Sequence, residues 1–139
     1  ALAPKVVAHK ALRGVPVRLE APDAIGDYIH ADCLARALCC LLRATTPRHE
    51  VYNVALGKAV TLAELVAIAA RKCPGARFET VAASQADIRG DASRKGGRWG
   101  AYDISRLVRE FGWRPRPLDE AFHSYIDWLA REDIGGSDA

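Results

Sequence analysis

The sequence predicts an α/β fold of about five helices and three or more short strands, with a sheet that this chain does not complete by itself. Three observations predict this class. Apolar residues recur at helical spacing in several segments and alternate in short runs between them. The strand candidates are separated by helices, which favours parallel pairing. One helix candidate is apolar around most of its circumference, and 139 residues are too few to cover such a helix completely.

The first elements of the chain are short. Residues 4–12 have the spacing of a helix, which Gly14 and Pro16 bring to an end. Residues 15–19 alternate as a strand, residues 22–26 form a turn, and residues 28–30 are extended.

Asp32 then occupies the position of a helix cap, and the helix is expected over residues 33–43. Nearly all of its residues are apolar, so we expect it to be buried on more than one side. Together with the small sheet, this helix indicates that polypeptide outside this chain completes the structure. The chain also begins with Ala1 and contains no Met, so we expect it to be a fragment.

The middle of the chain has the clearest boundaries. Residues 50–54 have strand composition and precede Gly57. Thr61 and Glu64 have the spacing of a capping box, which opens a helix through Lys72. Residues 77–81 alternate as a further strand.

The last third of the chain begins with a polar loop over residues 82–100, and a loop of this length is usually functional. Asp103 is expected to cap a helix over residues 104–111, which stops at Gly112. The final helix covers residues 118–131. We expect residues 1–134 to form the folded region and residues 135–139 to form a disordered tail.

The composition excludes several classes of protein. Half of the chain (50%) is apolar and 27% is charged, which disfavours disordered and fibrous proteins. No apolar run approaches the ~18 residues that span a bilayer, and no leader is recognisable. We therefore expect a cytoplasmic protein with no membrane partner.

The charge is unevenly distributed. The net charge of +3 is too small to indicate a nucleic-acid partner, and we expect none. Residues 89–116 contain 8 Arg or Lys against 3 Asp or Glu, a local balance of 8 − 3 = +5. Such a segment binds a small anion or phosphate, or is simply a solvated surface.

The four cysteines are interpreted as free thiols buried in the fold. A zinc site that combines His30 with Cys33 and Cys39 or Cys40 lacks the usual knuckle spacing, so we expect no metal.

Four segments carry recognisable motifs. Residues 26–37 read GDYIHADCLARA, residues 51–58 read VYNVALGK, residues 61–65 read TLAEL, and residues 103–106 and 111–115 read DISR and FGWRP. These segments are similar, in the same order, to R-D-Y-I-H-V-D-D-L-A-x-A, Y-N-[LIV]-G-x-G, [ST]-[LV]-x-E-L, and D-x-[ST]-[KR] with L-G-W-x-P. Those are motifs of the extended short-chain dehydrogenase/reductase family, which includes the nucleotide-sugar epimerases and dehydratases. The resemblance spans nearly the whole chain.

The resemblance implies the C-terminal substrate-binding part of a Rossmann-type enzyme that uses NAD or NADP. In this family an N-terminal Rossmann domain holds the cofactor on a Gly-rich turn, and a Tyr-x-x-x-Lys pair carries the hydride and proton chemistry. No tyrosine of this chain is followed four places later by Lys. We therefore expect the chain alone to bind no dinucleotide and to be inactive, with the N-terminal Rossmann domain of the same protein as its partner.

The resemblance also implies substrate-binding residues. The family has an Arg before its Asp-Tyr pair that contacts the substrate diphosphate, and here this position is Gly26. Tyr28 matches the family's aromatic residue, and either offers its hydroxyl to a substrate or packs under the next helix. His30 is interpreted as a packed, hydrogen-bonded residue. Asn53 either lies near the cofactor or forms a turn.

A second family Arg lies in an R-x-G-D setting within the long loop. Arg94, which is followed by Lys95 and Gly96, fits this setting without the Asp. Arg98 is the neighbouring alternative and Arg89 the more distant one. A guanidinium group suits phosphate recognition, and the glycines permit close approach of the backbone. The alternative for all three is a solvated loop.

Two functions are consistent with these observations. The first is the substrate-binding part of an NAD(P)-dependent epimerase, dehydratase or dehydrogenase that acts on a sugar or nucleotide sugar. The second is a non-catalytic binding or regulatory module derived from the same fold, which the replacement of the family Arg by Gly26 favours. A homodimer is compatible with either.

Overall fold

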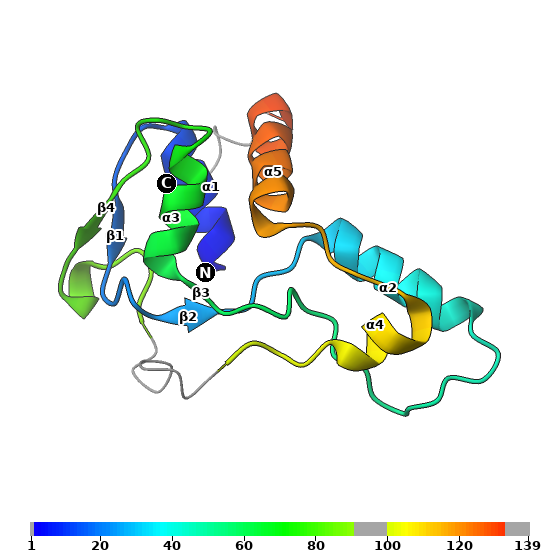
Figure 1. The fold of residues 1–139 in the computed structure, drawn as a ribbon. Helices are drawn as coiled ribbons and strands as arrows, with labels where there is room; N and C mark the ends of the chain where they lie inside the picture. Colours follow the sequence, from blue (N-terminus) through cyan, green and yellow to red (C-terminus); the bar gives the residue numbers. More distant parts are fainter. Residues whose placement is uncertain (1, 91–99, 133–139) are drawn as a thin grey trace.

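The computed structural model describes residues 2–90 and 100–132 (Figure 1). These ranges contain five α-helices, four short strands and one 3₁₀ turn. The elements are α1 (Ala3–Leu12), β1 (Val17–Leu19), β2 (Ile25–Gly26), α2 (Ala31–Arg43), β3 (Val60–Thr61), α3 (Leu62–Ala70), β4 (Phe78–Thr80), η1 (Ala83–Gln85), α4 (Ser105–Phe111) and α5 (Leu118–Glu132). The predicted α/β class is confirmed.

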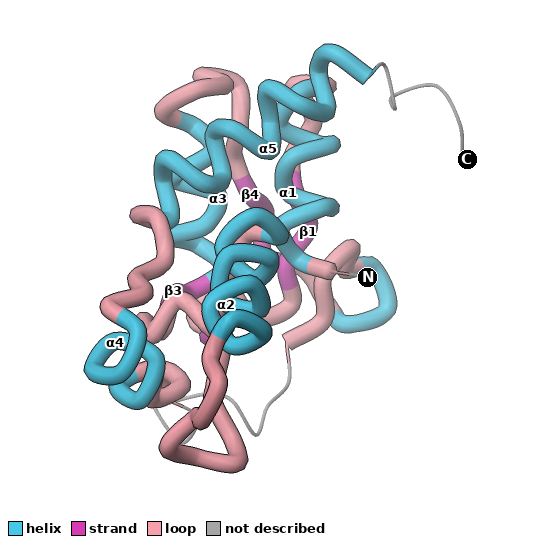
Figure 2. Tube along the Cα trace, turned by 90° about the vertical axis from the view of Figure 1, so that its right-hand side faces the viewer, coloured by secondary structure: helices cyan, strands magenta, loops and turns pink. Residues whose placement is uncertain are grey.

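The elements form two lobes, each with its own apolar core. In the first lobe, α1, α3 and α5 pack against one another and α1 also contacts β1 (Figures 1 and 2). Its core contains Val7, Leu19, Leu65, Phe122 and Ile126. The second lobe consists of α2, the following loop and α4, and its smaller core contains Cys33, Ala37, Leu107 and Trp113.

The sheet is small and divided. β1 pairs with β4 in parallel, with Val17 opposite Phe78, as the alternation of strands and helices predicts. β2 pairs with β3 in antiparallel orientation. The last two residues of the turn expected over residues 22–26 are therefore part of a strand. All three residues of β4 are exposed, and β1 is its one partner among the described strands, so β4 is an edge of this sheet.

The prediction of a strand at residues 50–54 is wrong, because this segment belongs to no strand of the described structure. A strand needs a neighbour for its backbone groups, and the described residues provide none here. Side chains hold the segment instead. The Tyr52 hydroxyl donates to Glu110 Oε2 at 2.7 Å, and Asn53 Nδ2 donates to the Asp103 carbonyl at 3.0 Å.

The start of α2 also differs from the prediction. Asp32 is not the cap, because the His30 side chain occupies that role: its Nδ1 accepts a hydrogen bond from the Asp32 amide at 3.1 Å. His30 is thus hydrogen-bonded, as predicted. The helix therefore begins at Ala31, two residues earlier than expected.

The body of α2 is less covered than the sequence suggests. Only Cys33 and Ala37 of this helix are buried. The exposed fractions of Leu34, Leu38 and Leu42 are 41%, 47% and 85%, and these three residues lie four apart on one face. The described part of the chain therefore leaves an apolar face of α2 open.

The other helix boundaries follow the predicted signals closely. Thr61 and Glu64 form the predicted capping box: the Thr61 amide donates to Glu64 Oε2 at 2.7 Å, and the Glu64 amide donates to Thr61 Oγ1 at 3.0 Å. α4 begins at Ser105, one residue later than expected, and its N-cap residue is Ile104 and not Asp103, although Asp103 Oδ1 accepts from the Ser105 amide at 2.8 Å. Gly112, at a φ of 63°, ends α4 in the left-handed region.

Three expectations concern absences or lie beyond these ranges. None of the described helices has the length and apolar character needed to cross a membrane. No cluster of His, Cys, Asp and Glu within residues 2–90 and 100–132 could hold a metal ion. The expected tail at residues 135–139 lies outside the described residues.

The cysteines are free, but burial applies to only one of them. Cys33 is buried, Cys40 and Cys73 are half-buried, and Cys39 is exposed on the open side of α2. The expectation of buried thiols is therefore wrong for Cys39, since the helix that carries it is covered on one side only.

Candidate functional site

A cavity of about 430 Å³ lies between the start of α1, the segment before α2, and α5. Its walls are mostly apolar, with a small number of polar groups, which is the usual character of a small-molecule site. It is lined by Leu2, Ala3, Pro4, Lys5, Asp27, Tyr28, Ile29, His30, Ala31, Leu65, Leu118, Ala121, Phe122 and Tyr125. Tyr28 is the one predicted site residue among them.

The Tyr28 ring lies directly over Gly26. A Cβ atom on Gly26 would lie 2.6 Å from both Cζ and the hydroxyl oxygen of Tyr28. No side chain fits at position 26 unless the ring moves away. Position 26 therefore offers no side chain to a ligand, and the Tyr28 ring occupies the space next to it.

Asp27 is a functional candidate that the sequence analysis did not single out. Its carboxylate accepts three backbone hydrogen bonds, from the amides of Leu56 (2.7 Å), Gly57 (3.1 Å) and Tyr102 (3.0 Å). These donors lie 29, 30 and 75 residues along the chain, so local sequence patterns give no signal for them. The position of Asp27 in the motif before Tyr28 is the only available hint.

Of the three predicted arginines, only Arg89 belongs to the part of the chain that the structure describes. Arg94 and Arg98 lie outside the described residues. Arg89 is exposed and is not part of the lining of the Tyr28 cavity. Its neighbour Gly90 donates its amide to Glu20 Oε2 at 3.1 Å, just beyond β1. An anion-binding role for these three residues stays a prediction.

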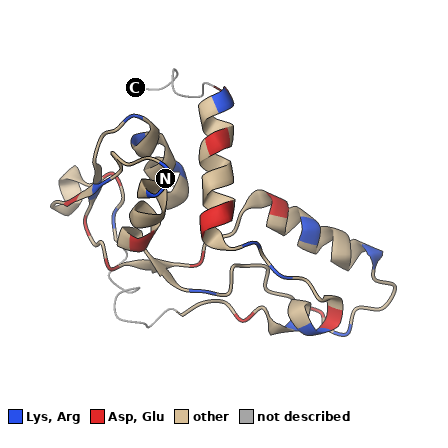
Figure 3. Ribbon diagram, turned by 45° about the horizontal axis from the view of Figure 1, so that its top comes forward, with Lys and Arg blue, Asp and Glu red and all other residues tan. Residues whose placement is uncertain are grey.

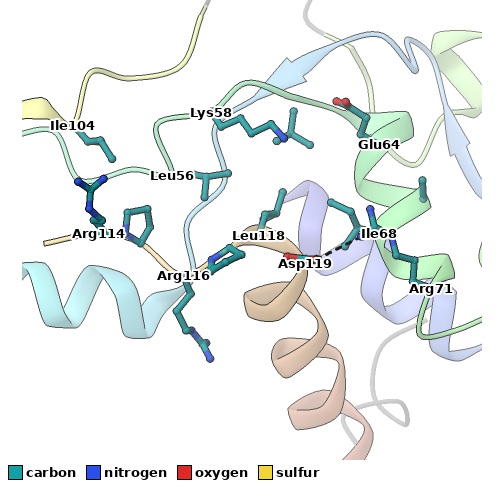
Figure 4. Close-up of a pocket in the computed structure, with 14 residues that line it drawn as sticks. Leu56, Lys58, Glu64, Ile68, Arg71, Ile104, Arg114, Arg116, Leu118 and Asp119 are labelled. Atoms are coloured by element: carbon teal, nitrogen blue, oxygen red, sulfur yellow. Dashed lines mark ion pairs between the residues drawn. The ribbon is translucent and has the colours of Figure 1, made fainter. Parts of the chain in front are cut away.

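A second cavity, of about 660 Å³, lies between α3, the loop before β3 and the linker that leads into α5 (Figure 4). Several of its charged residues already have partners. Arg71 pairs with Asp119 at 3.5 Å (Figure 4). The Arg116 guanidinium reaches Asp32, outside the cavity lining, at 3.6 Å. Glu64 is engaged in the capping box. This cavity therefore offers less unpaired charge than its residue types suggest.

The N-terminal turn of α2 holds a thiol beside two arginines. Cys33 Sγ accepts hydrogen bonds from the Arg116 amide and from the Arg36 guanidinium, both at 3.4 Å. Burial by itself raises the pKa of the Cys33 thiol, but these hydrogen bonds outweigh it and lower the pKa below its usual value. The hydrogen bond from the Arg116 amide ties α2 to the linker that leads into α5. Because Cys33 is only 1% exposed, its thiol is closed to reagents.

Charges of both signs are spread over the two lobes (Figure 3). The start of α2 carries Asp32 and its end carries Arg43, which complements the helix dipole.

The comparisons with known proteins point to one fold. No protein-family model matches this sequence, and no curated protein matches it. Solved structures do match. UDP-glucose 4-epimerase from Thermotoga maritima with UDP-glucose has a TM-score of 0.74 at 19% identity, over 95% of this chain and 40% of that chain.

Two further structures agree. MoeE5 in complex with UDP-glucuronic acid and NAD has a TM-score of 0.70 at 24% identity, over 93% of this chain and 41% of that chain. WbmF from Bordetella bronchiseptica in complex with NAD⁺ and UDP has a TM-score of 0.69 at 22% identity, over 94% of this chain and 36% of that chain. The chain thus spans about two-fifths of their length.

These matches confirm the predicted fold. The chain has the fold of the C-terminal part of short-chain dehydrogenase/reductase-type epimerases. The motifs that suggested this resemblance and the three-dimensional match point to the same fold.

Proposed function

We propose that residues 1–134 form the substrate-binding part of an NAD(P)-dependent enzyme that acts on a sugar or nucleotide sugar, as an epimerase, dehydratase or dehydrogenase. The observation that carries the proposal is the fold match over more than nine-tenths of the chain to structures solved with NAD, UDP or UDP-sugars. The Tyr28 cavity is the substrate side of this site. Its apolar walls exclude water, and its few polar groups orient the ligand.

The described residues do not fit the cofactor itself. A dinucleotide pyrophosphate is bound at a helix N-terminus by a Gly-rich turn that follows a strand. Here the helices that follow strands have a carboxylate in their first turn, Asp32 in α2 and Glu64 in α3. A carboxylate at that place repels phosphate. NAD or NADP, which supplies hydride exchange when bound, is therefore assigned to an N-terminal Rossmann domain of the same protein.

That domain is also the partner proposed for the open face of α2. This face carries three exposed leucines in a row, Leu34, Leu38 and Leu42. A contiguous exposed apolar patch of this kind is typical of an interaction surface. The unpaired segment at residues 50–54 lies in the same lobe and has strand composition. In this proposal the chain is inactive by itself, and the complete protein acts in the cytoplasm. A homodimer is a further prediction.

The Tyr28 ring over Gly26 favours a second candidate, a binding or regulatory module without catalysis. A chain that has replaced the Arg at this position has lost one charge-assisted contact to a diphosphate. In this alternative the cavity accepts a sugar or another small ligand without the phosphate groups.

Calorimetric titration of the 139-residue chain with UDP-glucose, glucose and NAD tests the proposal. The expected result is saturable binding of UDP-glucose and no binding of NAD. Tyr28→Phe removes only a hydroxyl in the cavity, and Tyr52→Phe is its matched control in the second lobe. Weaker binding in the first variant alone supports the assignment of the cavity. Binding of NAD by this chain alone would contradict it.

The gene sequence upstream of this chain gives an independent test. It is expected to encode a strand, a Gly-rich turn and a helix, followed by a Tyr-x-x-x-Lys pair. Retention of a partner protein with no nucleotide-sugar binding would favour the regulatory alternative.

A further inference from the structure

Within the described residues, four stretches lie between the elements of the two lobes. Residues 27–30 lead from β2 to α2, residues 44–59 return from α2 to β3, residues 100–104 precede α4, and residues 112–117 lead from α4 to α5 (Figure 1). Asp27 is the first residue of the first connection. The relative position of the lobes depends on how these stretches are held together.

The Asp27 carboxylate joins three of these connections. Oδ1 accepts from the Leu56 amide at 2.7 Å, whereas Oδ2 accepts from the Gly57 amide at 3.1 Å and the Tyr102 amide at 3.0 Å. Hydrogen bonds to an ionised carboxylate are among the stronger ones in proteins. One side chain therefore fixes the return from the second lobe and the approach to α4 against its own segment.

The two partner segments are also close to each other. Gly57 has a φ of 74°, and a Cβ atom at this position would lie 2.9 Å from Ile104 Cδ1. A residue other than glycine would be strained there and would push the segments apart. The packing at Gly57 and the hydrogen bonds to Asp27 thus hold the same junction.

The junction borders the candidate site. Asp27 lines the cavity and directly precedes Tyr28, whose ring rests on Gly26. A shift of the Asp27 backbone would move both residues that flank it. On the basis of the proposed function, we infer that Asp27 is a positioning residue: its carboxylate sets the place of Tyr28, and so the shape of the substrate cavity, by clamping the lobe connections.

The variant Asp27→Asn tests the clamp because it keeps the size of the side chain. The Asn side chain has one oxygen and one NH₂ group, and the NH₂ group cannot accept from a backbone amide. It can therefore serve either Leu56 or the pair Gly57 and Tyr102. Asp23→Asn is the matched control, since Asp23 is exposed in the preceding turn.

The first measurement is amide hydrogen exchange followed by NMR. In the wild-type protein the amides of Leu56, Gly57 and Tyr102 are expected to be protected, although they lie outside helices and strands. In Asp27→Asn at least one side of the clamp should exchange about tenfold faster, while α3 core amides stay unchanged. Fast exchange of all three amides in the wild-type protein overturns the proposal, whether or not the variant folds.

The second measurement reports the place of Tyr28 without any ligand. The ring over Gly26 should give a nuclear Overhauser contact to the Gly26 α protons and shift their resonances. Asp27→Asn should weaken both signals, and Asp23→Asn should leave them unchanged. Retention of the Tyr28–Gly26 contact after loss of the clamp means that Asp27 has only a structural role, which refutes the proposal.

Titration with UDP-glucose separates this inference from the proposed function. If the wild-type chain binds UDP-glucose, Asp27→Asn should weaken the affinity about tenfold and Asp23→Asn should not. If the wild-type chain does not bind, the assignment of the substrate has failed, while the two NMR measurements still decide whether Asp27 positions Tyr28.

Discussion

The Tyr28 ring lies so close to the backbone of Gly26 that a Cβ atom on Gly26 would lie 2.6 Å from the ring. The absence of a side chain at position 26 is thus what allows the ring to line the cavity. The orientation of the Tyr28 ring therefore depends on glycine at position 26.

The substitution Gly26→Ala should therefore displace the Tyr28 ring and lower the free energy of unfolding by roughly 1–2 kcal/mol. Urea denaturation measures this change. Gly100→Ala is the matched control, because nothing lies within 4 Å of a Cβ atom at Gly100.

The same substitution in a Tyr28→Ala background should cost much less, because the ring that it strikes is gone. An equal cost of Gly26→Ala in both backgrounds would show that the contact has no energetic consequence.

A second prediction concerns the dependence of stability on pH. Asp87 is held by Lys10 at 2.6 Å and by the Arg18 amide at 2.7 Å. Burial raises the pKa of Asp87. The hydrogen bonds from Lys10 and Arg18 and the charge of Lys10 lower it by more than burial raises it, so the pKa lies below the ordinary value of 3.8. Because the folded pKa is depressed, this stabilisation is present above pH 3.8 and is lost as the pH falls through the folded pKa.

Asp87→Asn should accordingly destabilise the protein by roughly 1–2 kcal/mol at neutral pH and by less at acidic pH. Unfolding followed by circular dichroism between pH 7 and about pH 3 measures the difference. Asp23→Asn serves as the control, and a destabilisation by Asp87→Asn that does not change with pH would contradict this account.

The parts of the fold that could be predicted are those encoded locally. The helix that starts at the Thr61 capping box, and the stop at Gly112, depend on residues within one turn of each other. The parallel pairing of β1 and β4 could be expected because helices separate these strands.

The parts that could not be predicted depend on remote partners. Residues 50–54 have the composition of a strand, but a strand exists only where another strand pairs with it. The helix start at His30 was missed because a histidine ring can replace a carboxylate as hydrogen-bond acceptor. Resemblance to known motifs led to Tyr28, whereas the cavity walls at Phe122 and Tyr125 come from nearly a hundred residues away.

A third prediction concerns the open face of α2. Leu42 is 85% exposed, so Leu42→Ala should change the free energy of unfolding of this chain by less than about 0.5 kcal/mol. Leu65 is fully buried, and Leu65→Ala should cost roughly 2–5 kcal/mol.

The same Leu42→Ala change should become costly once the proposed N-terminal domain is present, because that domain would cover the face. Comparison of the two chain lengths by urea denaturation decides this. A large effect of Leu42→Ala in the 139-residue chain alone would mean that something else already covers Leu42.

The last prediction concerns the thiols of α2, which differ in access although they lie on one helix. Cys39 is exposed and Cys33 is 1% exposed. The lowered pKa of Cys33 would favour its thiolate, and a thiolate reacts faster than a thiol when a reagent can reach it. Access therefore opposes the intrinsic reactivity of Cys33, and access should decide the outcome in the folded protein.

Iodoacetamide followed by peptide mass spectrometry should label Cys39 within minutes and Cys33 only after the second lobe opens. In urea the difference should disappear, because the contacts from Arg36 and Arg116 that lower the pKa of Cys33 are lost together with the burial. Rapid labelling of Cys33 in the native chain would show that the core of the second lobe opens readily in the absence of a partner domain.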